Sequence, residues 1–464
     1  MKTRYFILSM MSLALASCGK YVDVKTQGEL VPKETINYRY LLNNTSALET
    51  GPQIGDVSSD DVQLVDGSPQ QLTLSPSGYY GWWEQAYLWQ PVLFPIGQYQ
   101  TDGNWAGMYN TITYSNTVIQ EVPASTGGSA TDKAELIAEA KVHRADAYLM
   151  LMNTYAKPYN ASTASTDLGV PLVLIETTTQ SLARPTIQQV YDQIVTDLKQ
   201  AVPALPTVQN FNTLPSRASA YSELARCYLY MNDYANANKY ADSALALRNT
   251  LNDLSTFTAV STATYPLRIK DPEVLLSKVA NGGVSVYSPT SLRLSDSLLA
   301  ILGTKDQRYT LFTADALAIY SSSPGRYFAK DFFLYEARNI GPSVPEMMLI
   351  KAEYYARKSD ITNAMLWVNN LRKKRFLAAD YADLTTSSAS AALKIVIEER
   401  RREFFCRMLR WWDMRRLKSE SQFQQTYTRT FGGATYTLAP TSNRYVFQIP
   451  AYQVQLNPEM QQNP

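Results

Sequence analysis

Histidine and cysteine are nearly absent from this chain of 464 residues, which contains one histidine and three cysteines. Zinc sites and histidine-based catalytic triads need these side chains, so the sequence lacks most of what either would require. The one histidine, His143, lies in a strongly helical stretch, where we expect a polar position on a helix. We therefore predict no metal site, no cofactor and no catalytic signature.

The few cysteines also argue against a disulfide framework. Beyond Cys18, only Cys227 and Cys406 remain, and both lie in apolar helical contexts. In an exported protein these two could pair. Two buried thiols are an equally good reading, and the sequence leaves this open.

The chain also lacks a large excess of positive or of negative charge. The chain has 43 Lys and Arg against 41 Asp and Glu, and Lys2 and Arg4 at the N-terminus account for the difference. A neutral protein lacks the excess positive charge that binding to nucleic acid requires, so we exclude nucleic acid as a partner. Hydrophobic residues make up 45% of the chain, enough for a sizeable core.

Long apolar runs are missing beyond the N-terminus, so no later segment is predicted to span a membrane. The N-terminus itself has a basic start, a short apolar stretch over 5–16 and small residues before Cys18. This pattern is typical of a secretory signal over 1–17. Leu15-Ala16-Ser17-Cys18 resembles a bacterial lipobox, which implies acylation of Cys18, and several acyl chains hold a membrane firmly. We expect 18–33 to be a lipidated tether; the alternative is an ordinary cleaved signal.

Apolar residues at helical spacing predict a mainly α-helical body over 34–464, which we treat as one domain. Loop-rich segments are expected near 51–103 and 250–342, with a few short strands. Alternation around Gly432-Gly433 predicts a small hairpin. The predicted helical segments are 104–122, 132–157, 186–202, 216–248, 345–375 and 388–417. For 132–157, Asp132 with Glu135 is the expected cap.

Two of these segments resemble tetratricopeptide repeats, which are pairs of helices about 34 residues long. In 216–248 an aromatic, a leucine, a small residue and a second aromatic share one face, and small residues follow on the second helix. In 345–375 the matching positions recur, although Lys351 departs from the pattern. Asn249 stands where a proline is usual after the first pair.

Several segments together resemble one family of proteins. They are RADAYLMLMNTYAKPY (144–159), ARPTIQQVYDQIVTDLKQAVPALP (183–206), PSRASAYSELARCYLYMNDYANANKYADSAL (215–245), SDSLLAILGTKDQRYTLF (295–312), PEMMLIKAEYYAR (345–357), IEERRREFFCRMLRWWDMRR (397–416) and YVFQIPAYQVQLNPEMQQNP (445–464). In their order and spacing they resemble the SusD/RagB outer-membrane nutrient-capture lipoproteins, and the resemblance runs from Cys18 to the C-terminus.

The resemblance implies a helical scaffold, anchored in the outer membrane at the cell surface, that acts as a lid on a SusC-like TonB-dependent transporter. It implies binding of a nutrient, often an oligosaccharide, without catalysis. The alternatives are a peptide, glycopeptide or other nutrient on the same scaffold, a glycoside hydrolase with two carboxylates, or a structural adaptor of helical repeats.

The most specific hypothesis about the ligand comes from an aromatic cluster near 79–89. An aromatic plane stacks on the apolar C–H face of a sugar, and nearby polar groups bond its hydroxyls. Adjacent rings point different ways, so Trp82 and Trp83 are not expected to face a ligand together. We expect about half of the cluster to be packing. The candidates are Tyr79, Tyr80, Trp82, Trp83 and Trp89.

The family resemblance adds rings from the second loop-rich segment, here Tyr287, Tyr320, Tyr327 and Phe328, although no tryptophan occurs there. Residues 51–78 are expected to form an ordered or semi-ordered loop, with a solvated run over 56–61. The carboxylates of Asp60 and Asp61 in that run are candidates for bonding sugar hydroxyls.

The same loop has some of the spacing of a calcium-binding loop, with Asp56, Ser58 and Asp60 at alternate positions. The twelfth position, where such a loop needs Glu, is Gly67. The sequence therefore favours a solvated loop over a calcium site.

The last candidate for a functional site is the charged run over 398–416. Glu398 with Arg402, and Glu403 with Arg407, are four residues apart on a helix, which favours a structural lattice of ion pairs over an anion site. Trp411 and Trp412 are expected to pack this helix on its neighbours.

Overall fold

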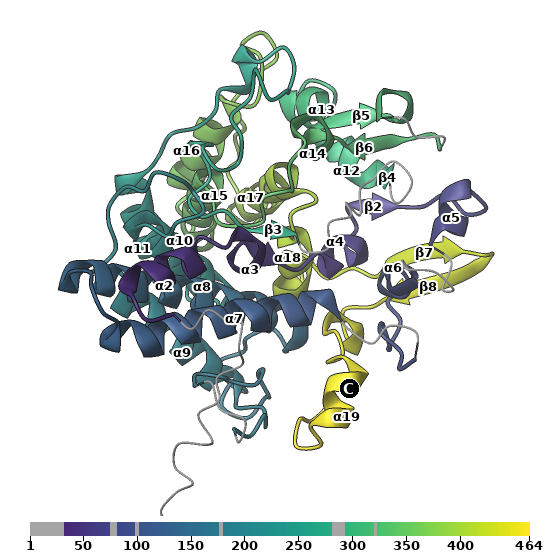
Figure 1. Cartoon of the computed structure of the whole chain (residues 1–464). Coiled ribbons are helices and arrows are strands. Elements are labelled where there is room, and N and C mark those ends of the chain that lie inside the picture. Colours follow the sequence, from purple (N-terminus) through teal and green to yellow (C-terminus); the bar gives the residue numbers. More distant parts are fainter. Residues whose placement is uncertain (1–31, 75–80, 98–101, 176–179, 281–292, 320–322) are drawn as a thin grey trace, which may run out of the picture.

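The structure is a computed structural model that describes residues 32–74, 81–97, 102–175, 180–280, 293–319 and 323–464 (Figure 1). Helices dominate it, which confirms the mainly α-helical prediction. One side, here called the scaffold, is built from long helices. These are α2 (Thr35–Leu42), α7 (Gly103–Glu121), α8 (Ala130–Tyr155), α9 (Ile187–Ala201), α10 (Arg217–Tyr230), α11 (Tyr234–Leu247), α15 (Val344–Arg357), α16 (Ile361–Arg372) and α17 (Ala389–Phe404).

Local capping explains where several of these helices begin. The Thr186 hydroxyl accepts the backbone N–H of Gln189, whose side chain accepts the N–H of Thr186 in return, so α9 begins in a capping box. Helix α8 begins two residues earlier than expected. Its capping box is Ser129 with Asp132, which corrects the predicted cap of Asp132 with Glu135.

The two tetratricopeptide-like pairs are confirmed as α10–α11 and α15–α16. Both pairs turn through a residue of positive φ, Asn232 at 59° and Ser359 at 61°. In each pair the next residue is an aspartate, Asp233 or Asp360, whose carboxylate caps the second helix. The repeated turn explains why two distant segments of the chain adopt the same hairpin.

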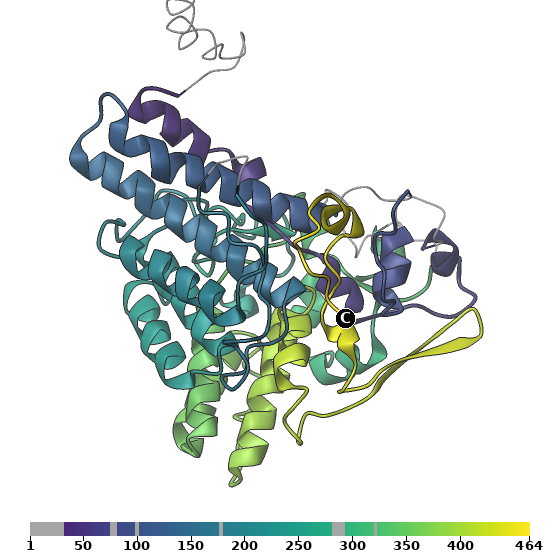
Figure 2. The same cartoon turned by 90° about the horizontal axis from the view of Figure 1, so that it is seen from below.

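The described residues also form short helices and four two-stranded sheets, most of which gather on the other side, here called the loop-rich side (Figures 1 and 2). β1 (Thr50–Gly51) pairs in parallel with β3 (Val279–Ala280); the antiparallel pairs are β2 (Val62–Gln63) with β4 (Arg293–Leu294), β5 (Thr313–Asp315) with β6 (Arg326–Phe328), and β7 (Tyr427–Phe431) with β8 (Ala434–Leu438). The short helices are α3 (Thr45–Leu48), α4 (Ile54–Ser58), α5 (Pro69–Thr73), α6 (Gly81–Tyr87), α12 (Asp296–Leu302), α13 (Gln307–Phe312), α14 (Lys330–Leu334), α18 (Leu409–Leu417) and α19 (Ala451–Leu456).

The predicted hairpin near the C-terminus is confirmed as β7–β8, turning at Gly432 and Gly433, which have φ of 59° and 75°. The Asp66 carboxylate accepts both of their backbone N–H groups, at 2.6 and 2.9 Å. The tip of the hairpin is therefore attached to the segment that follows β2.

The single helix predicted over 388–417 is wrong, because the chain breaks between α17 and α18. Cys406 and Met408 have φ of 60° and 65° there. The N–H of Met408 donates to the Asp56 carboxylate at 2.6 Å, and the N–H of Cys406 donates to that of Asp61 at 3.3 Å. Two buried carboxylates thus replace the helical acceptors that the break removes.

These contacts also correct the expectation of a solvated loop over 56–61. Asp56 belongs to helix α4 and is 1% exposed, and Asp61 is fully buried. Burial raises the pKa of Asp56 to about 7, even though Arg338 and the N–H of Met408 lower it. Within the described ranges, no group of three or more His, Cys, Asp or Glu side chains is placed to hold a metal ion.

His143 and the two cysteines that the structure describes lie in the core. Cys227 and Cys406 are both buried and form no disulfide with each other. His143 is fully buried on α8, with Nδ1 3.0 Å from the Lys278 ammonium. Burial, and then Lys278, hold the pKa of His143 well below its usual value, so the ring is neutral. The expected polar helix position is therefore a buried one.

The charged run forms a lattice of ion pairs, as predicted, although only one of the two predicted pairs is part of it. Glu398 and Arg402 pair at 3.7 Å. Glu403 pairs with Arg308 at 2.6 Å and Arg375 at 2.8 Å, and among the ion pairs of the described residues none joins it to Arg407. The core positions of Trp411 and Trp412, 0% and 1% exposed, are confirmed. No helix in the described part of the chain is long and apolar enough to cross a bilayer.

Candidate ligand-binding site

A cavity of about 440 Å³ lies on the loop-rich side beside the β7–β8 hairpin. Four segments of the chain meet there: the end of α4 with β2, the end of α6, the start of α12, and strand β7. Its lining residues are Asp60, Val62, Gln63, Leu64, Asp66, Tyr87, Trp89, Ser295, Ser297, Gln425, Thr426, Tyr427, Thr428, Arg429 and Thr430. We call it the hairpin cavity.

Hydrogen-bonding side chains dominate the accessible wall of the hairpin cavity. Exposed hydroxyls come from Ser297, Thr426, Thr428 and Thr430, and an exposed amide comes from Gln425. Hydroxyl and amide groups both donate and accept, which suits a ligand rich in hydroxyls.

The apolar wall consists of the rings of Tyr87 and Trp89, which both pack on the guanidinium of Arg429. The Arg429 guanidinium lies 3.9 Å from the ring centre of Tyr87 and 4.4 Å from that of Trp89. Arg429 also donates to backbone carbonyls of the segment that ends α4. The stack fixes β7 against α6.

Trp89 lines the hairpin cavity but does not present an open ring. It is 6% exposed, its indole N–H donates to the carbonyl of Ser58 at 2.9 Å, and Arg429 covers one face. This corrects the expectation that Trp89 stacks on a ligand: its ring is already stacked on the protein.

Asp60 lines the same cavity, and its carboxylate is tied to two arginines. Arg410 donates twice to it, at 2.6 and 2.9 Å, and Arg401 lies 3.3 Å away. Burial alone would raise the pKa of Asp60, but Arg410 and Arg401 lower it to about 2. Asp60 is therefore an ionised acceptor. Asp61 is fully buried and bonds Arg401 at 2.9 Å, which corrects its expected role toward a ligand.

On α6, Trp82 and Trp83 differ in burial, although their rings meet edge-on with centres 5.7 Å apart. Trp83 is 1% exposed and belongs to the core, so it offers no face to a ligand. Trp82 is half-buried and stacks on Phe94, with ring centres 5.7 Å apart and planes at 28°. Of the predicted aromatic candidates that the structure describes, Trp82 is the one with a partly accessible ring.

The second loop-rich segment supplies no accessible candidate ring among its described residues. Tyr327 lies on β6, is fully buried, and donates to the carbonyl of Ser323 at 3.0 Å. Phe328 is 5% exposed and packs edge-on against Phe405. Tyr327 and Phe328 thus pack the core, which corrects their assignment as binding rings.

Five predicted positions lie outside the described residues. They are Cys18, Tyr79, Tyr80, Tyr287 and Tyr320.

Sequence reasoning missed the contribution of the hairpin itself. Strand β7 carries the exposed threonines of the cavity and Arg429 on alternate faces, as a strand does. That alternation was visible in the sequence and predicted the strand. Nothing in it indicated that the strand would lie beside Asp60 and Trp89.

The scaffold is of helical-repeat type, and comparison with known proteins gives the family of the chain. The SusD-like model described as starch-binding and associating with the outer membrane matches residues 20–229, and the SusD family model matches 345–464. The chain belongs to the SusD/RagB family.

Individual relatives are distant. A SusD-like protein of Bacteroides ovatus is 28% identical over 257 residues, which cover 53% of this chain and 43% of the relative, so the match spans less than half of that protein. A SusD superfamily protein of Bacteroides thetaiotaomicron VPI-5482 superposes with a TM-score of 0.72 at 20% identity, covering 93% of this chain and all of the other. Surface glycan-binding protein A of Bacteroides uniformis gives 0.67 at 16%, covering 92% and 99%. These two structures share the fold.

Proposed function

We propose that this protein binds a glycan at the cell surface and delivers it to a SusC-like TonB-dependent transporter. Family membership carries the proposal, because one matching model is described as starch-binding and associating with the outer membrane. A protein of the same fold is named as a surface glycan-binding protein. A polar cavity and a partly accessible indole on one side of the molecule support it.

Binding without catalysis is part of the proposal. A glycoside hydrolase needs two carboxyl groups free to exchange protons or attack across the scissile bond. In the hairpin cavity Asp60 is paired with Arg410 and Arg401, and Asp66 holds the hairpin turn. Both carboxylates have structural partners. Chromatography of the bound glycan after prolonged incubation should show no shortened products; their appearance would contradict this part.

The Trp82 ring is the proposed stacking surface. Trp82→Ala should weaken glycan binding about tenfold, because one aromatic–sugar contact contributes on the order of 1 kcal/mol. Affinity gels containing soluble starch and a panel of other polysaccharides would identify the ligand, and calorimetry with its oligosaccharides would measure the change.

The matched control is Trp367→Ala, which removes a half-buried tryptophan from α16 on the scaffold. It should leave the affinity unchanged. Loss of binding in the Trp367 variant alone would refute the site. Retention by a peptide panel and by no polysaccharide would favour a peptide nutrient on the same scaffold.

We also propose a lipid anchor on Cys18, with 18–33 as the tether to the outer membrane. Cys18→Ser should move the protein from the membrane fraction to the soluble fraction and abolish incorporation of labelled palmitate, because acylation needs the thiol. Cys227→Ser, at a buried cysteine of α10, is the control and should stay in the membrane fraction. Unchanged labelling of the Cys18 variant would exclude the anchor.

A further inference from the structure

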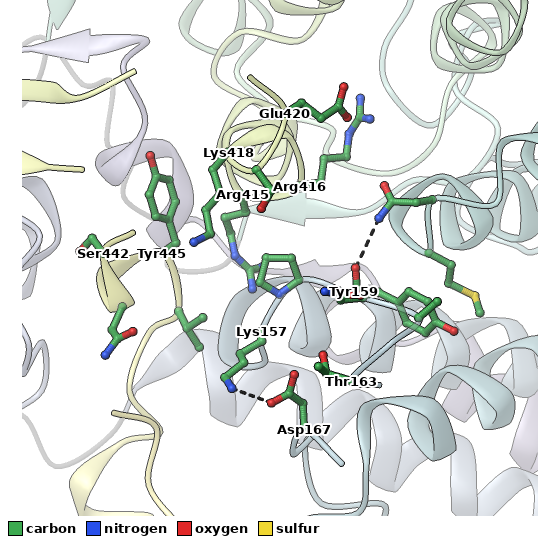
Figure 3. Close-up of a pocket in the computed structure, with 18 of the residues that line it drawn as sticks. Lys157, Tyr159, Thr163, Asp167, Arg415, Arg416, Lys418, Glu420, Ser442 and Tyr445 are labelled. Atoms are coloured by element: carbon green, nitrogen blue, oxygen red, sulfur yellow. Dashed lines mark hydrogen bonds and ion pairs between the residues drawn. The ribbon is translucent and has the colours of Figure 1, made fainter. Parts of the chain in front are cut away.

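A second cavity, of about 620 Å³, lies where the scaffold meets the C-terminal segments (Figure 3). It is bounded by the segment that follows α8, by the turn between α10 and α11, by α18 and the residues after it, and by residues 442–446. It shares no lining residue with the hairpin cavity. We call it the basic cavity.

Most of the charges on its wall are already paired. Lys157 pairs with Asp167 at 2.5 Å. Arg416 pairs with Glu353 at 2.6 Å, and Glu420 pairs with Arg357 at 2.8 Å. Both acidic side chains that line the cavity, Asp167 and Glu420, therefore have a cation.

Two cations of the wall remain without an acid. Among the ion pairs of the described residues, none includes Arg415 or Lys418. Arg415 is 2% exposed, one of its N–H groups donates to the carbonyl of Ala156, and its Nε atom has no hydrogen-bond partner. Figure 3 shows its side chain extending from α18 toward the segment of Lys157 and Tyr159.

Arg416, the next residue on α18, has the counter-charges that Arg415 lacks among the described residues. Burial lowers the pKa of Arg415 to about 10, and no carboxylate offsets it. Burial acts on Arg416 too, but Glu353 and Asp413 raise its pKa well above the usual value. A buried cation without a counter-charge is costly, so Arg415 is a site that an anion would stabilise.

Lys418 adds a second positive charge to the same wall. Its ammonium donates to the carbonyl of Pro440 at 2.8 Å and lies 5.1 Å from the ring centre of Tyr445. Burial, and then the nearby Arg415, lower the pKa of Lys418. The two cations thus repel each other, and an anion near both would remove that repulsion.

The rest of the wall indicates what kind of anion fits. Tyr159 is half-buried, and Ser442, Asn443, Asn160 and Thr163 supply hydroxyl and amide groups. The volume is many times that of a water molecule, which occupies about 30 Å³ in the liquid. A bare inorganic anion would leave most of these groups and most of this space unused.

From this arrangement we infer that the basic cavity binds a carboxylate-bearing sugar, a hexuronic acid unit, with its carboxylate toward Arg415 and Lys418. The hydroxyls of the ring then meet the serine, threonine and asparagine side chains. The inference goes beyond the proposed function, because the site is separate from the hairpin cavity and from Trp82.

Calorimetry at constant ionic strength tests it with three probes: D-glucuronate, D-glucose and acetate. Glucuronate should bind saturably and at least tenfold more tightly than either of the others, since it alone combines the carboxylate with the hydroxyls. Equal binding of glucose and glucuronate would overturn the inference, and so would acetate binding as tightly as glucuronate.

Variants locate the site. Arg415→Met should abolish the preference for glucuronate over glucose, and Lys418→Met should reduce it several-fold. Lys141→Met, which removes a half-buried lysine from α8, is the control and should change nothing. Because Arg415→Met removes a buried hydrogen bond and can impair folding, Lys418→Met and the three-probe comparison on the unaltered protein decide independently of it.

The site is separable from the proposed function. Trp82→Ala should leave glucuronate binding intact, and loss of glucuronate binding in that variant would overturn the separate site. Glucuronate binding that survives both Arg415→Met and Lys418→Met would overturn the assignment to the basic cavity.

Discussion

Arg308→Met is expected to destabilise the fold by about 3–5 kcal/mol, because it removes the cation shared by three buried carboxylates. Arg308 is fully buried on α13. Its guanidinium donates to Asp306 at 2.6 and 2.9 Å, to Glu399 at 2.7 Å and to Glu403 at 2.6 Å. Methionine keeps an unbranched apolar stem but has no guanidinium, so the substitution removes the charge together with its hydrogen bonds.

The three carboxylates are not affected equally. Glu399 keeps Arg372 at 3.0 Å and Glu403 keeps Arg375 at 2.8 Å. Among the ion pairs of the described residues, Asp306 has Arg308 alone. Asp306 would therefore become a buried charge without a counter-ion, and most of the cost should arise there.

Urea unfolding followed by circular dichroism would measure the loss, which is a large share of the stability of a typical protein. The double variant Arg308→Met/Asp306→Asn should recover part of it, because it removes the stranded charge together with its partner. Arg293→Met is the control: its partner Asp296 has a side chain 77% exposed, so the change should be below about 1 kcal/mol. An Arg308 variant as stable as this control would refute the account.

Helices were predictable where their signals are local. The hydrophobic spacing of α9 marked the helix in the sequence, and the capping pair that begins it, Thr186 and Gln189, is also local. The break between α17 and α18 was missed because its cause is distant. No proline or glycine marks it, and the carboxylates that stabilise it, Asp56 and Asp61, come from about 350 positions earlier.

The same difference between local signals and distant causes applies to the predictions at the candidate site. Their adjacency indicated that Trp82 and Trp83 would not both face a ligand, and Trp83 is buried whereas Trp82 is half-buried. The environment of Trp89 was not predictable, since the arginine that covers its ring comes from strand β7. The spacing of Glu398 and Arg402 gave one ion pair, whereas Arg308, which joins the lattice from α13, has no signal near that helix.

Glu353→Gln is expected to make the protein markedly less sensitive to acid. Glu353 is fully buried on α15, where Arg416 donates to it twice, at 2.6 and 2.7 Å, and Arg357 lies 2.8 Å away. Burial alone would raise its pKa, but Arg416 and then Arg357 lower it from 4.5 to about 2.

The direction of the pH effect follows from that depressed pKa. The unfolded chain takes up a proton at Glu353 near pH 4.5, before the folded protein does, so acid favours unfolding. The contribution of Glu353 to stability is fully present above about pH 5 and is lost as the pH falls toward 2. A shift of this size corresponds to roughly 3 kcal/mol.

Urea unfolding at pH 7, 5, 4 and 3 would measure the effect. Glu353→Gln should lower the free energy of unfolding by about 3 kcal/mol at pH 7, and the difference from the unaltered protein should shrink steadily below pH 5. Glu398→Gln makes the same chemical change at a side chain 38% exposed, and it should keep the acid sensitivity of the unaltered protein. A Glu353 variant whose deficit is the same at pH 3 and pH 7 would show that packing, and not the charge, accounts for its loss of stability.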